Sequence, residues 1–543
     1  MNDSFLRRPL FWQLLAVLLL IPALFTHLGL LPLDTGSDEP RRALVALEMI
    51  FSGDYITPTL NGEPYFNKPP GYNWLIALSY TAFGNFSSFA LRFPMAVSLV
   101  LYGLTIFLLV RKELGSRVGF AAALMLVTNA RILLYDSLLG LIDIAFSWLT
   151  FAAFILVYQF DRKKNYWALF LTTYLLTAVG YMMKGLPSLV FQGLTLGSYF
   201  LYTRQFRRLF HPAHFAGVAL FLLLVGSYYV AYFTRNNIPP EKIAAVLFDE
   251  SAKRTVVQFG ITETLLHLVT FPFQMLYFYA PWMLMVVFLL RKPKADSSGM
   301  PFFQKITSWA ATLHPFILFN AVTFAVNFVI YWSSPQVYAR YLFMLLPLLF
   351  TIFAYSYYES RPTDWRRRGW DGLMGIVLTV VTIGCWTPFF MPETKDMPDL
   401  WWQVPLIFVA LAFVTWQYWR QPANRLVILF AFLGVVRIGF NWFVLPPRIE
   451  HRQFYKDSSE KVARLSLGKP LYGYKETIGR DGSTDVNSCH IEVVRGEVLK
   501  RTDQKIPGAL YIADSASLAG ERYRVLHEFL LFDQWPAKLV QFE

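Results

Sequence analysis

Long apolar stretches alternate with short polar connections along most of the chain. A helix that crosses a bilayer needs about twenty apolar residues, and about 13 stretches approach that length. They lie near residues 10–31, 90–110, 117–133, 140–160, 166–182, 186–203, 215–233, 271–290, 312–332, 341–358, 371–390, 401–419 and 426–445. A further run at 72–83 is too short to span and is expected at the membrane interface. The pattern predicts an all-α polytopic membrane protein, because helices satisfy their own backbone polar groups in lipid.

The polar connections alternate in charge. Every second one carries a cluster of Lys and Arg, whereas the short connections between these carry only isolated cations, namely Arg131, Lys184, Arg340 and Lys395. The clusters are Arg7/Arg8, Arg111/Lys112/Arg117, Arg162/Lys163/Lys164, Arg204/Arg207/Arg208, Arg291/Lys292/Lys294, Arg366/Arg367/Arg368 and Arg420/Arg425. Basic clusters stay on the cytoplasmic side, so the N-terminus is expected in the cytoplasm. An odd number of spans then places the C-terminus outside an inner (plasma) membrane.

From about Pro446 the chain has the composition of a soluble protein. Two runs, 491–494 and 509–512, are rich in β-branched or aromatic residues and are typical of strands. We expect a transmembrane domain over residues 1–445 and a small α/β extracytoplasmic domain over residues 446–543. No motif in the second domain indicates a chemistry.

The composition supports this fold class. Of the 543 residues, 55% are hydrophobic and 16% are charged, against about a quarter charged in soluble domains. The net charge of +13 comes mainly from the basic clusters between apolar runs. That distribution is typical of membrane orientation and gives no support for a nucleic-acid partner. Membrane lipids are the expected surroundings of the chain.

One polar stretch, residues 34–72, follows the first apolar span directly and is rich in ionisable side chains. Charged groups held against a bilayer are costly, so they indicate a function. Pro40 follows an acidic pair, and apolar residues recur at helical spacing over 43–51. This pattern predicts a short amphipathic helix along the membrane surface. Asn61-Gly62 and then Lys68-Pro69-Pro70-Gly71 predict turns.

The same stretch carries a resemblance to a known family. It contains an acidic pair before Pro-Arg, a helix ending in Ser-Gly-Asp-Tyr, and then Leu-Asn-Gly, Tyr-Phe and Lys-Pro-Pro. In that order these segments resemble the first external loop of the lipid A aminoarabinose transferases. Those enzymes and the protein O-mannosyltransferases are membrane glycosyltransferases of the GT-C architecture. The resemblance implies an external catalytic loop at 32–72, with Asp38 at the catalytic centre and Lys68 and Arg41 on a lipid-linked phosphate.

Two further aspartates are candidates for a second catalytic carboxylate. Asp143 lies inside the fourth span, where a carboxylate must face the protein interior. The family has an aspartate at the start of this span, which Asp143 matches. Asp136 competes for the role, because it lies about two helical turns earlier. A paired structural role is the alternative for Asp143, and a helix cap is the alternative for Asp38.

Four more residues are candidates for substrate binding. Lys184 matches a Lys-Gly pair of the family, and its alternative is a lysine that snorkels to the interface. Arg340 and Tyr341 match an Arg-Tyr pair that precedes a proline-containing span. Arg254 lies in a long external loop expected at 234–270. Anchoring to lipid headgroups is the alternative for both arginines.

The sequence supports neither a metal nor a nucleotide cofactor. Its histidines lack ligand spacing, and Asn67 stands where relatives often have a glutamate before the lysine of the Lys-Pro motif. A divalent metal is therefore unsupported. The sequence contains no Walker motif and no dinucleotide-binding glycine pattern.

Taken with the resemblance, these residues predict an integral membrane glycosyltransferase. The implied donor is a sugar on a polyprenyl phosphate, which is undecaprenyl phosphate in a bacterium. The acceptor is expected outside the cytoplasm and is lipid A, another envelope glycan or a protein. Asp38 would be the base for a hydroxyl acceptor, or would orient groups around a phosphate acceptor. A polytopic lipid or sugar transporter is the alternative, because buried charges also mark transport paths.

Overall fold

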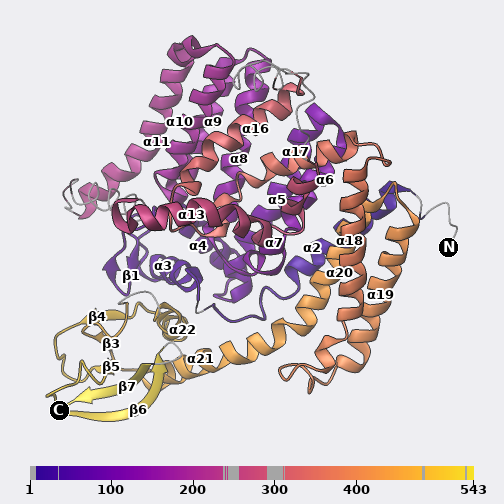
Figure 1. The fold of residues 1–543 in the computed structure, drawn as a ribbon. Coiled ribbons are helices and arrows are strands. Elements are labelled where there is room, and N and C mark those ends of the chain that lie inside the picture. The colour runs from indigo at the N-terminus through magenta and orange to yellow at the C-terminus, as the bar shows by residue number, and fades with distance from the viewer. Residues whose placement is uncertain are drawn as a thin grey trace.

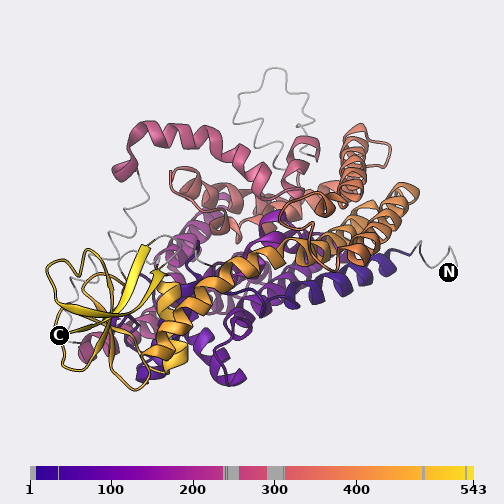
Figure 2. The same cartoon turned by 90° about the horizontal axis from the view of Figure 1, so that it is seen from below.

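The computed structural model describes residues 6, 8–34, 36–236, 239, 241, 256–289, 310, 312–479, 484–531 and 535–543. Figure 1 shows a large helical bundle and a smaller domain at the C-terminal end of the chain. Figure 2 shows the same two parts from below, with the smaller domain at one end of the bundle. The all-α membrane fold with a small C-terminal α/β domain is confirmed.

Most apolar stretches form helices of the bundle. These are α2 (Pro9–Phe25), α5 (Ser88–Leu114), α6 (Ser116–Val127), α7 (Ala130–Leu134), α8 (Ile142–Arg162), α9 (Tyr166–Lys184), α10 (Pro187–Tyr202), α11 (Pro212–Asn236), α13 (Val256–Phe278), α14 (Met285–Leu289), α16 (Pro315–Trp332), α17 (Leu346–Glu359), α18 (Trp365–Gly384), α19 (Leu400–Arg420) and α20 (Arg425–Phe443). Short 3-10 turns join some of them: η1 (Asp136–Leu138), η2 (Phe206–Phe210), η3 (Trp282–Leu284), η4 (Ala339–Leu342) and η5 (Thr387–Phe389).

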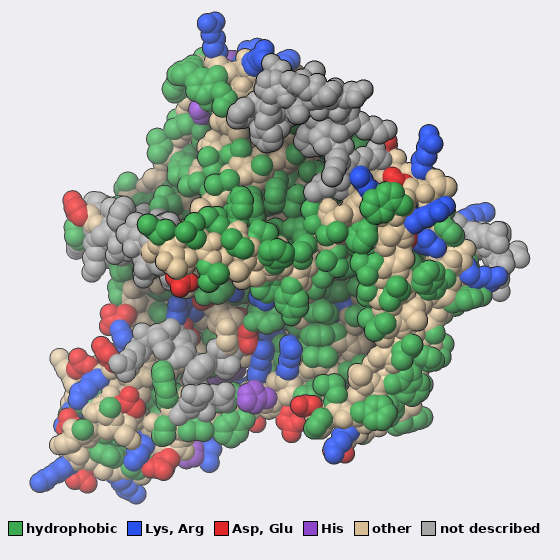
Figure 3. Space-filling model, viewed as in Figure 1, with side chains coloured by type: hydrophobic (Ala, Val, Ile, Leu, Met, Phe, Trp, Pro, Cys, Tyr) green, Lys and Arg blue, Asp and Glu red, His purple; other side chains and the backbone are tan. Residues whose placement is uncertain are grey.

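The bundle carries several membrane spans. Among the described residues, eight helices are long and apolar enough to cross a bilayer, and a ninth span results if the bent pair at 116–138 is one span. α2 is apolar but shorter. Figure 3 shows hydrophobic side chains over much of the bundle and many charged ones over the C-terminal domain. The chain is therefore a multi-pass membrane protein, whereas the number of about 13 spans stays a prediction.

The expectation of one helix over 271–290 was wrong. α13 ends at Phe278, a turn follows at residues 279–281, and η3 and α14 continue the chain. Pro281 has no backbone N–H to donate, which favours a break at this point. α13 also begins at Val256, inside the segment 234–270 that was expected to be a loop. In Figures 1 and 2 it lies across the outside of the bundle.

The polar stretch after α2 forms a helix and a hairpin. α3 (Glu39–Ser52) begins after Asp38 and ends at Gly53 in the left-handed conformation. β1 (Thr59–Leu60) and β2 (Glu63–Pro64) pair antiparallel. Their turn, Asn61-Gly62, has positive φ at both residues, as a tight hairpin requires. α4 (Gly71–Phe83) follows and fills the short apolar run at 72–83.

The expected helix forms as α3, but it is covered by other parts of the protein on more than its apolar side. Ten of the eleven positions from Glu39 to Met49 are buried, including the charged Glu39, Arg42 and Glu48, and Arg41 is the exception. The bundle covers one side of the helix, and α22 (Asp485–Arg495) of the C-terminal domain packs on it as well. An amphipathic pattern gives the apolar side of a helix but does not show that a distant segment covers the polar side.

The C-terminal domain begins after α21 (Leu445–Leu465), a long helix that leaves the bundle (Figure 1). Its five-stranded mixed sheet has the order β4-β3-β5-β7-β6. The strands are β3 (Leu471–Tyr474), β4 (Lys500–Thr502), β5 (Leu510–Asp514), β6 (Tyr523–Leu531) and β7 (Trp535–Phe542). The run 509–512 lies in β5 as expected. The run 491–494 lies in α22, so its assignment as a strand was wrong: Ile491 packs into the core of the domain from a helix.

Candidate active site

A pocket lies where the polar stretch meets the bundle. It is lined by Asp38, Arg42, Lys68, Leu141, Ile142, Asp143, Lys184, Arg340 and Tyr341. These residues come from the start of α3, the segment before α4, the start of α8, the end of α9 and η4. Segments far apart in the sequence therefore bring most of the predicted site residues to one place.

Asp38 is the accessible carboxylate of this pocket. It stands at the N-cap position of α3, but its side chain caps no backbone N–H. Instead Arg340 Nη2 donates to Asp38 Oδ2 at 3.0 Å, and the Asp38 side chain is 52% exposed. The Asp38 side chain therefore does not cap the helix in this structure. A half-exposed carboxylate beside a cation can accept a proton or orient a substrate group.

Asp143 is the buried carboxylate of the pocket. Lys184 Nζ donates to Asp143 Oδ1 at 2.5 Å, and Arg340 Nε lies 3.2 Å from Asp143 Oδ2. The ammonium of Lys184 also lies 4.1 Å from the centre of the Tyr341 ring. Asp143 thus holds two cations in fixed positions, while Arg340 bridges the buried carboxylate and the accessible one.

Close backbone packing brings two lysines to the same pocket. A Cβ atom on Gly71 would lie 2.7 Å from the backbone oxygen of Met182, so only glycine fits there. Gly185 follows Lys184 with a φ of 81°, which again favours glycine. The Lys-Pro-Pro-Gly segment therefore packs against the end of α9, and Lys68 and Lys184 both line the pocket.

Arg42, which the sequence analysis did not select, lines the pocket, whereas Arg41 does not. Arg42 is buried; its Nη2 donates to the Tyr65 hydroxyl at 2.6 Å, and its Nη1 has no hydrogen-bond partner in the described part of the chain. Arg41 instead pairs with Asp485 of α22 at 2.8 Å. Consecutive helical residues point about 100° apart, so only one of the two can face the pocket.

Asp136 and Arg254 are not part of this pocket. Asp136 is buried and accepts from Arg131 Nε at 2.6 Å, next to the ring of Tyr135. Asp136 lies in η1 and does not line the pocket, so Asp143 is the second carboxylate of the pocket. Arg254 lies outside the described residues.

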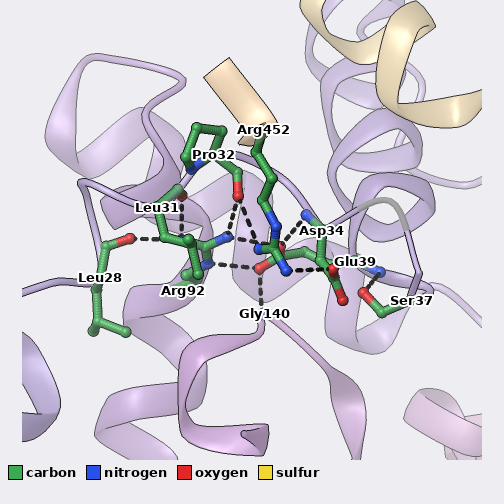
Figure 4. Close-up of polar contacts among 9 residues, drawn as sticks. All are labelled: Leu28, Leu31, Pro32, Asp34, Ser37, Glu39, Arg92, Gly140 and Arg452. Carbon is green, nitrogen blue, oxygen red and sulfur yellow. Dashed lines mark hydrogen bonds and ion pairs between the residues drawn. The ribbon is translucent and has the colours of Figure 1, made fainter. Parts of the chain in front are cut away.

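Glu39, next to Asp38, faces the interior and forms a buried network with Arg92 of α5 (Figure 4). Arg92 Nε and Nη2 donate to the two Glu39 oxygens at 2.6 and 2.7 Å. The backbone N–H groups of Gly140 and Asp34 donate to the same carboxylate at 2.7 and 3.1 Å. Arg92 also donates to backbone oxygens of the preceding loop, those of Leu28, Leu31 and Pro32.

This network fixes the backbone on both sides of the pocket. Burial alone would raise the pKa of Glu39, but the Arg92 guanidinium and the backbone donors hold that pKa below its usual value. Gly140 lies three residues before Asp143, so Glu39 links the start of α3 to the start of α8. Sequence analysis did not select Arg92, although Arg92 is a charge inside an apolar stretch, which is the signal that selected Asp143.

The charges of the pocket suit an anionic ligand. Four cations and two carboxylates line it, so it is net positive when all are ionised. Arg and Lys side chains are the usual protein partners of phosphate oxygens. Among the described residues, no group of three or more His, Cys, Asp or Glu side chains is placed to hold a metal ion.

The chain is similar in sequence to known proteins over part of its length. A model of the family "Dolichyl-phosphate-mannose-protein mannosyltransferase" matches residues 67–231. An uncharacterised protein of Aquifex aeolicus is 27% identical over 212 residues, which are 38% of this chain and 41% of the relative. The undecaprenyl phosphate-alpha-4-amino-4-deoxy-L-arabinose arabinosyl transferase of Shewanella sediminis is 35% identical over 151 residues, 26% of this chain and 27% of the relative. The matches thus span about a quarter to two fifths of these relatives' lengths.

The fold comparison covers nearly the whole chain. The crystal structure of ArnT from Cupriavidus metallidurans bound to undecaprenyl phosphate matches with a TM-score of 0.67. The match covers 97% of each chain at 19% sequence identity. The chain therefore has the fold of this protein. The resemblance to the GT-C aminoarabinose and mannosyl transferases is confirmed in both sequence and fold.

Proposed function

We propose that this chain is an integral membrane glycosyltransferase that takes a sugar from a polyprenyl phosphate, undecaprenyl phosphate in a bacterium. The observation that carries the proposal is the pocket itself, where a half-exposed carboxylate lies among four cations. Such cations hold the phosphate of a lipid-linked donor, and the carboxylate serves the acceptor. The arabinosyl transferase names of the relatives and the ligand of the ArnT structure support this donor class.

The reaction is a single displacement. The acceptor oxygen attacks the anomeric carbon as the bond from that carbon to the phosphate oxygen breaks. The electron pair of the broken bond leaves with the polyprenyl phosphate, whose new charge Lys68, Arg42 and Arg340 stabilise. With a hydroxyl acceptor, Asp38 takes the proton from the attacking oxygen; with a phosphate acceptor, the oxygen is already ionised and Asp38 orients it.

The acceptor is an envelope component outside the cytoplasm: lipid A, another envelope glycan or a protein. We propose that the chain lies in the inner membrane with its N-terminus in the cytoplasm. Contacts between α3 and α22 put the catalytic loop and the C-terminal domain on one side. The alternating basic clusters support the assignment of that side as the outside.

We propose that transfer requires no cofactor, because the cations of the protein neutralise the charge that develops on the polyprenyl phosphate. The pocket is lined by Lys68, Lys184, Arg42 and Arg340, which supports a role for these cations in binding the leaving group. Transfer is expected to continue in excess EDTA at an unchanged rate. A loss of transfer that added Mg²⁺ or Mn²⁺ restores would contradict this part of the proposal.

Reconstituted vesicles test the main proposal against the transporter alternative, which has no support from the relatives compared. Purified protein is incubated with a polyprenyl-phosphate-linked 4-amino-4-deoxyarabinose and with lipid A as the acceptor. A transferase depletes the lipid-linked sugar and yields glycosylated acceptor. A transporter moves the donor to the other leaflet without breaking the sugar–phosphate bond.

Orientation is tested by cysteine labelling from the two sides of sealed vesicles, in a background without Cys385 and Cys489. Ser37→Cys and the exposed Gln504→Cys should react only from the outside, and the exposed Thr363→Cys only from the inside. Reaction of Ser37→Cys only from the cytoplasmic side would reverse the proposed topology.

A further inference from the structure

The C-terminal domain makes an ion pair with the catalytic loop. Arg41 Nε donates to Asp485 Oδ2 at 2.8 Å, and the Asp485 side chain is 1% exposed. Arg41 lies in the first turn of α3, between Asp38 and Arg42, which both line the pocket. A buried carboxylate of the distant domain therefore holds the turn that carries two pocket residues.

A second contact joins the middle of the same two helices. Glu48 of α3 and Glu492 of α22 are both fully buried, and their carboxyl groups interact. Glu48 accepts from the backbone N–H groups of Asn61 and Gly62 at 2.5 and 3.1 Å, while Glu492 accepts from Leu499 N at 2.9 Å. Burial raises the pKa of Glu48 to about 7, and burial together with the charge of Glu48 raises the pKa of Glu492 as well.

The hairpin that follows α3 is also held by the C-terminal domain. Asn61 Nδ2 donates to the backbone oxygen of Leu499 at 3.4 Å, and Arg501 N donates to the backbone oxygen of Asn61 at 3.4 Å. A Cβ atom on Gly62 would lie 2.9 Å from Lys500 Cγ, so the turn lies directly against β4. On α21, Arg452 donates to Asp34 Oδ1 at 2.5 Å, at the start of the catalytic loop.

We propose that the C-terminal domain is a positioning element of the transfer site, and that Asp485, through Arg41, fixes where Asp38 and Arg42 stand in the pocket. This inference rests on the proposed function. Arg41 and Asp485 are positioning residues, since neither lines the pocket. A displacement of about 1 Å at reacting groups can slow a reaction by about a hundredfold, so the orientation of α3 matters directly for transfer.

A double-mutant cycle tests the pair in the full-length protein. Arg41→Gln and Asp485→Asn each remove the ion pair and are each expected to slow transfer about tenfold. The double variant should be no slower than the slower single variant, because both substitutions break one interaction. Losses that multiply, or normal transfer by Asp485→Asn, would overturn the proposal. Asp457→Asn, the same substitution at an exposed position of α21, is the control and should transfer normally.

Hydrogen exchange gives a readout that does not depend on transfer. The amides of α3 should exchange faster in Asp485→Asn than in the wild type, while those of α8 and α9 should not change. Unchanged exchange in α3 would overturn the positioning role. If the wild type transfers no sugar, the proposed function fails, but the exchange comparison still decides whether the C-terminal domain holds α3.

Arg41→Lys keeps the charge and covers the case in which Arg41→Gln does not fold. The lysine variant should retain more transfer and more α3 protection than the glutamine variant. Equal losses in the two variants would contradict a role that acts through the ion pair. A fall in polyprenyl phosphate binding in Arg41→Gln without any fall in Asp485→Asn would also overturn the proposal, by showing that Arg41 contacts the ligand itself.

Discussion

Asp38 and Glu39 are consecutive carboxylates that each pair with an arginine, yet their surroundings differ completely. Asp38 meets Arg340 in the pocket and is half exposed. Glu39 meets Arg92 in the interior, where both side chains are fully buried. The comparison predicts that the accessible pair can hold a reacting group, whereas the buried pair has a structural role.

The hydrogen bonds of the two carboxylates explain the difference. Glu39 accepts from Arg92, Gly140 and Asp34, so its oxygens have no capacity left for a ligand (Figure 4). Asp38 accepts one hydrogen bond from Arg340 and turns part of its surface to the pocket. Loss of a partner exposes Asp38 to water, but it leaves Glu39 as a buried unpaired charge. Substitution of Asp38 should therefore reduce transfer, whereas substitution of Glu39 should reduce stability.

Asp38→Asn should give the largest effect on activity. The amide keeps the size of the side chain but accepts no proton, so transfer to a hydroxyl acceptor should fall by about 10²–10⁴-fold. The thermal midpoint and the binding of polyprenyl phosphate should stay close to those of the wild type, because the cations remain. Near-normal transfer at matched expression would show that Asp38 does not act on the substrate, and the catalytic role would pass to Asp143.

Glu39→Gln should instead give the largest effect on stability. Removing one partner of a buried ion pair costs about 3–5 kcal/mol, because the Arg92 charge stays buried without compensation. The expected result is a lower thermal midpoint and a lower yield of folded protein. A variant that keeps the wild-type thermal midpoint but transfers no sugar would show that Glu39 takes part in the reaction. That result would contradict the assignment of a structural role to Glu39.

Lys68→Ala should weaken the donor site without affecting folding. A charge-assisted contact to phosphate contributes about 1.5–3 kcal/mol, so polyprenyl phosphate affinity should fall by roughly ten- to a hundredfold. Binding is measured with purified protein in detergent, and the midpoint should not change. Arg42→Gln should act in the same direction if Arg42 contacts the phosphate. Unchanged binding by Lys68→Ala would remove it from the donor site.

Sequence analysis identified the site residues whose signal is local. Asp38, Lys68 and Lys184 lie in short motifs, and Asp143 is a charge inside an apolar stretch, which lipid makes costly. Sequence analysis selected Arg41 instead of Arg42 for the pocket. Arg41 in fact pairs with Asp485, 444 residues away in the sequence, and no local pattern could indicate this partner. Asp485 was missed for the same reason, because it acts through a contact between distant segments. Arg92 was missed although it carries the same local signal as Asp143.

The fold shows the same limit. Apolar length and composition predicted the bundle, because lipid leaves few alternatives to helices. The burial of α3 and the helical state of 491–494 depended on each other, since α22 covers α3 only when both are formed. β-branched residues favour strands only weakly, and tertiary packing overrode that preference in α22.

A third pair, Glu48 with Glu492, consists of two carboxyl groups and contains no arginine. We expect it to have the smallest effect on transfer. Glu48 faces Glu492 and Asp485 of α22, the Asn61 and Gly62 amides and the Thr59 hydroxyl, with Lys500 next to Gly62. Burial raises the pKa of Glu48 to about 7, so the folded state binds a proton that the unfolded chain releases above about 4.5. The stability that this contact contributes is therefore fully present below the pKa that Glu48 has in the unfolded chain. It is lost as the pH rises through the pKa that Glu48 has in the folded protein.

Between pH 6 and pH 8, α3 should lose protection from hydrogen exchange, and transfer should fall by about two- to fivefold. Glu492→Gln removes the ionisable group that interacts with Glu48, so α3 in this variant should depend much less on pH. The experiment compares exchange in α3 for wild type and Glu492→Gln at the two pH values, with α8 as the internal reference. The same pH dependence in both proteins would show that protonation of Glu48 and Glu492 does not hold the C-terminal domain on the catalytic loop, and Asp485 with Arg41 would carry that role alone.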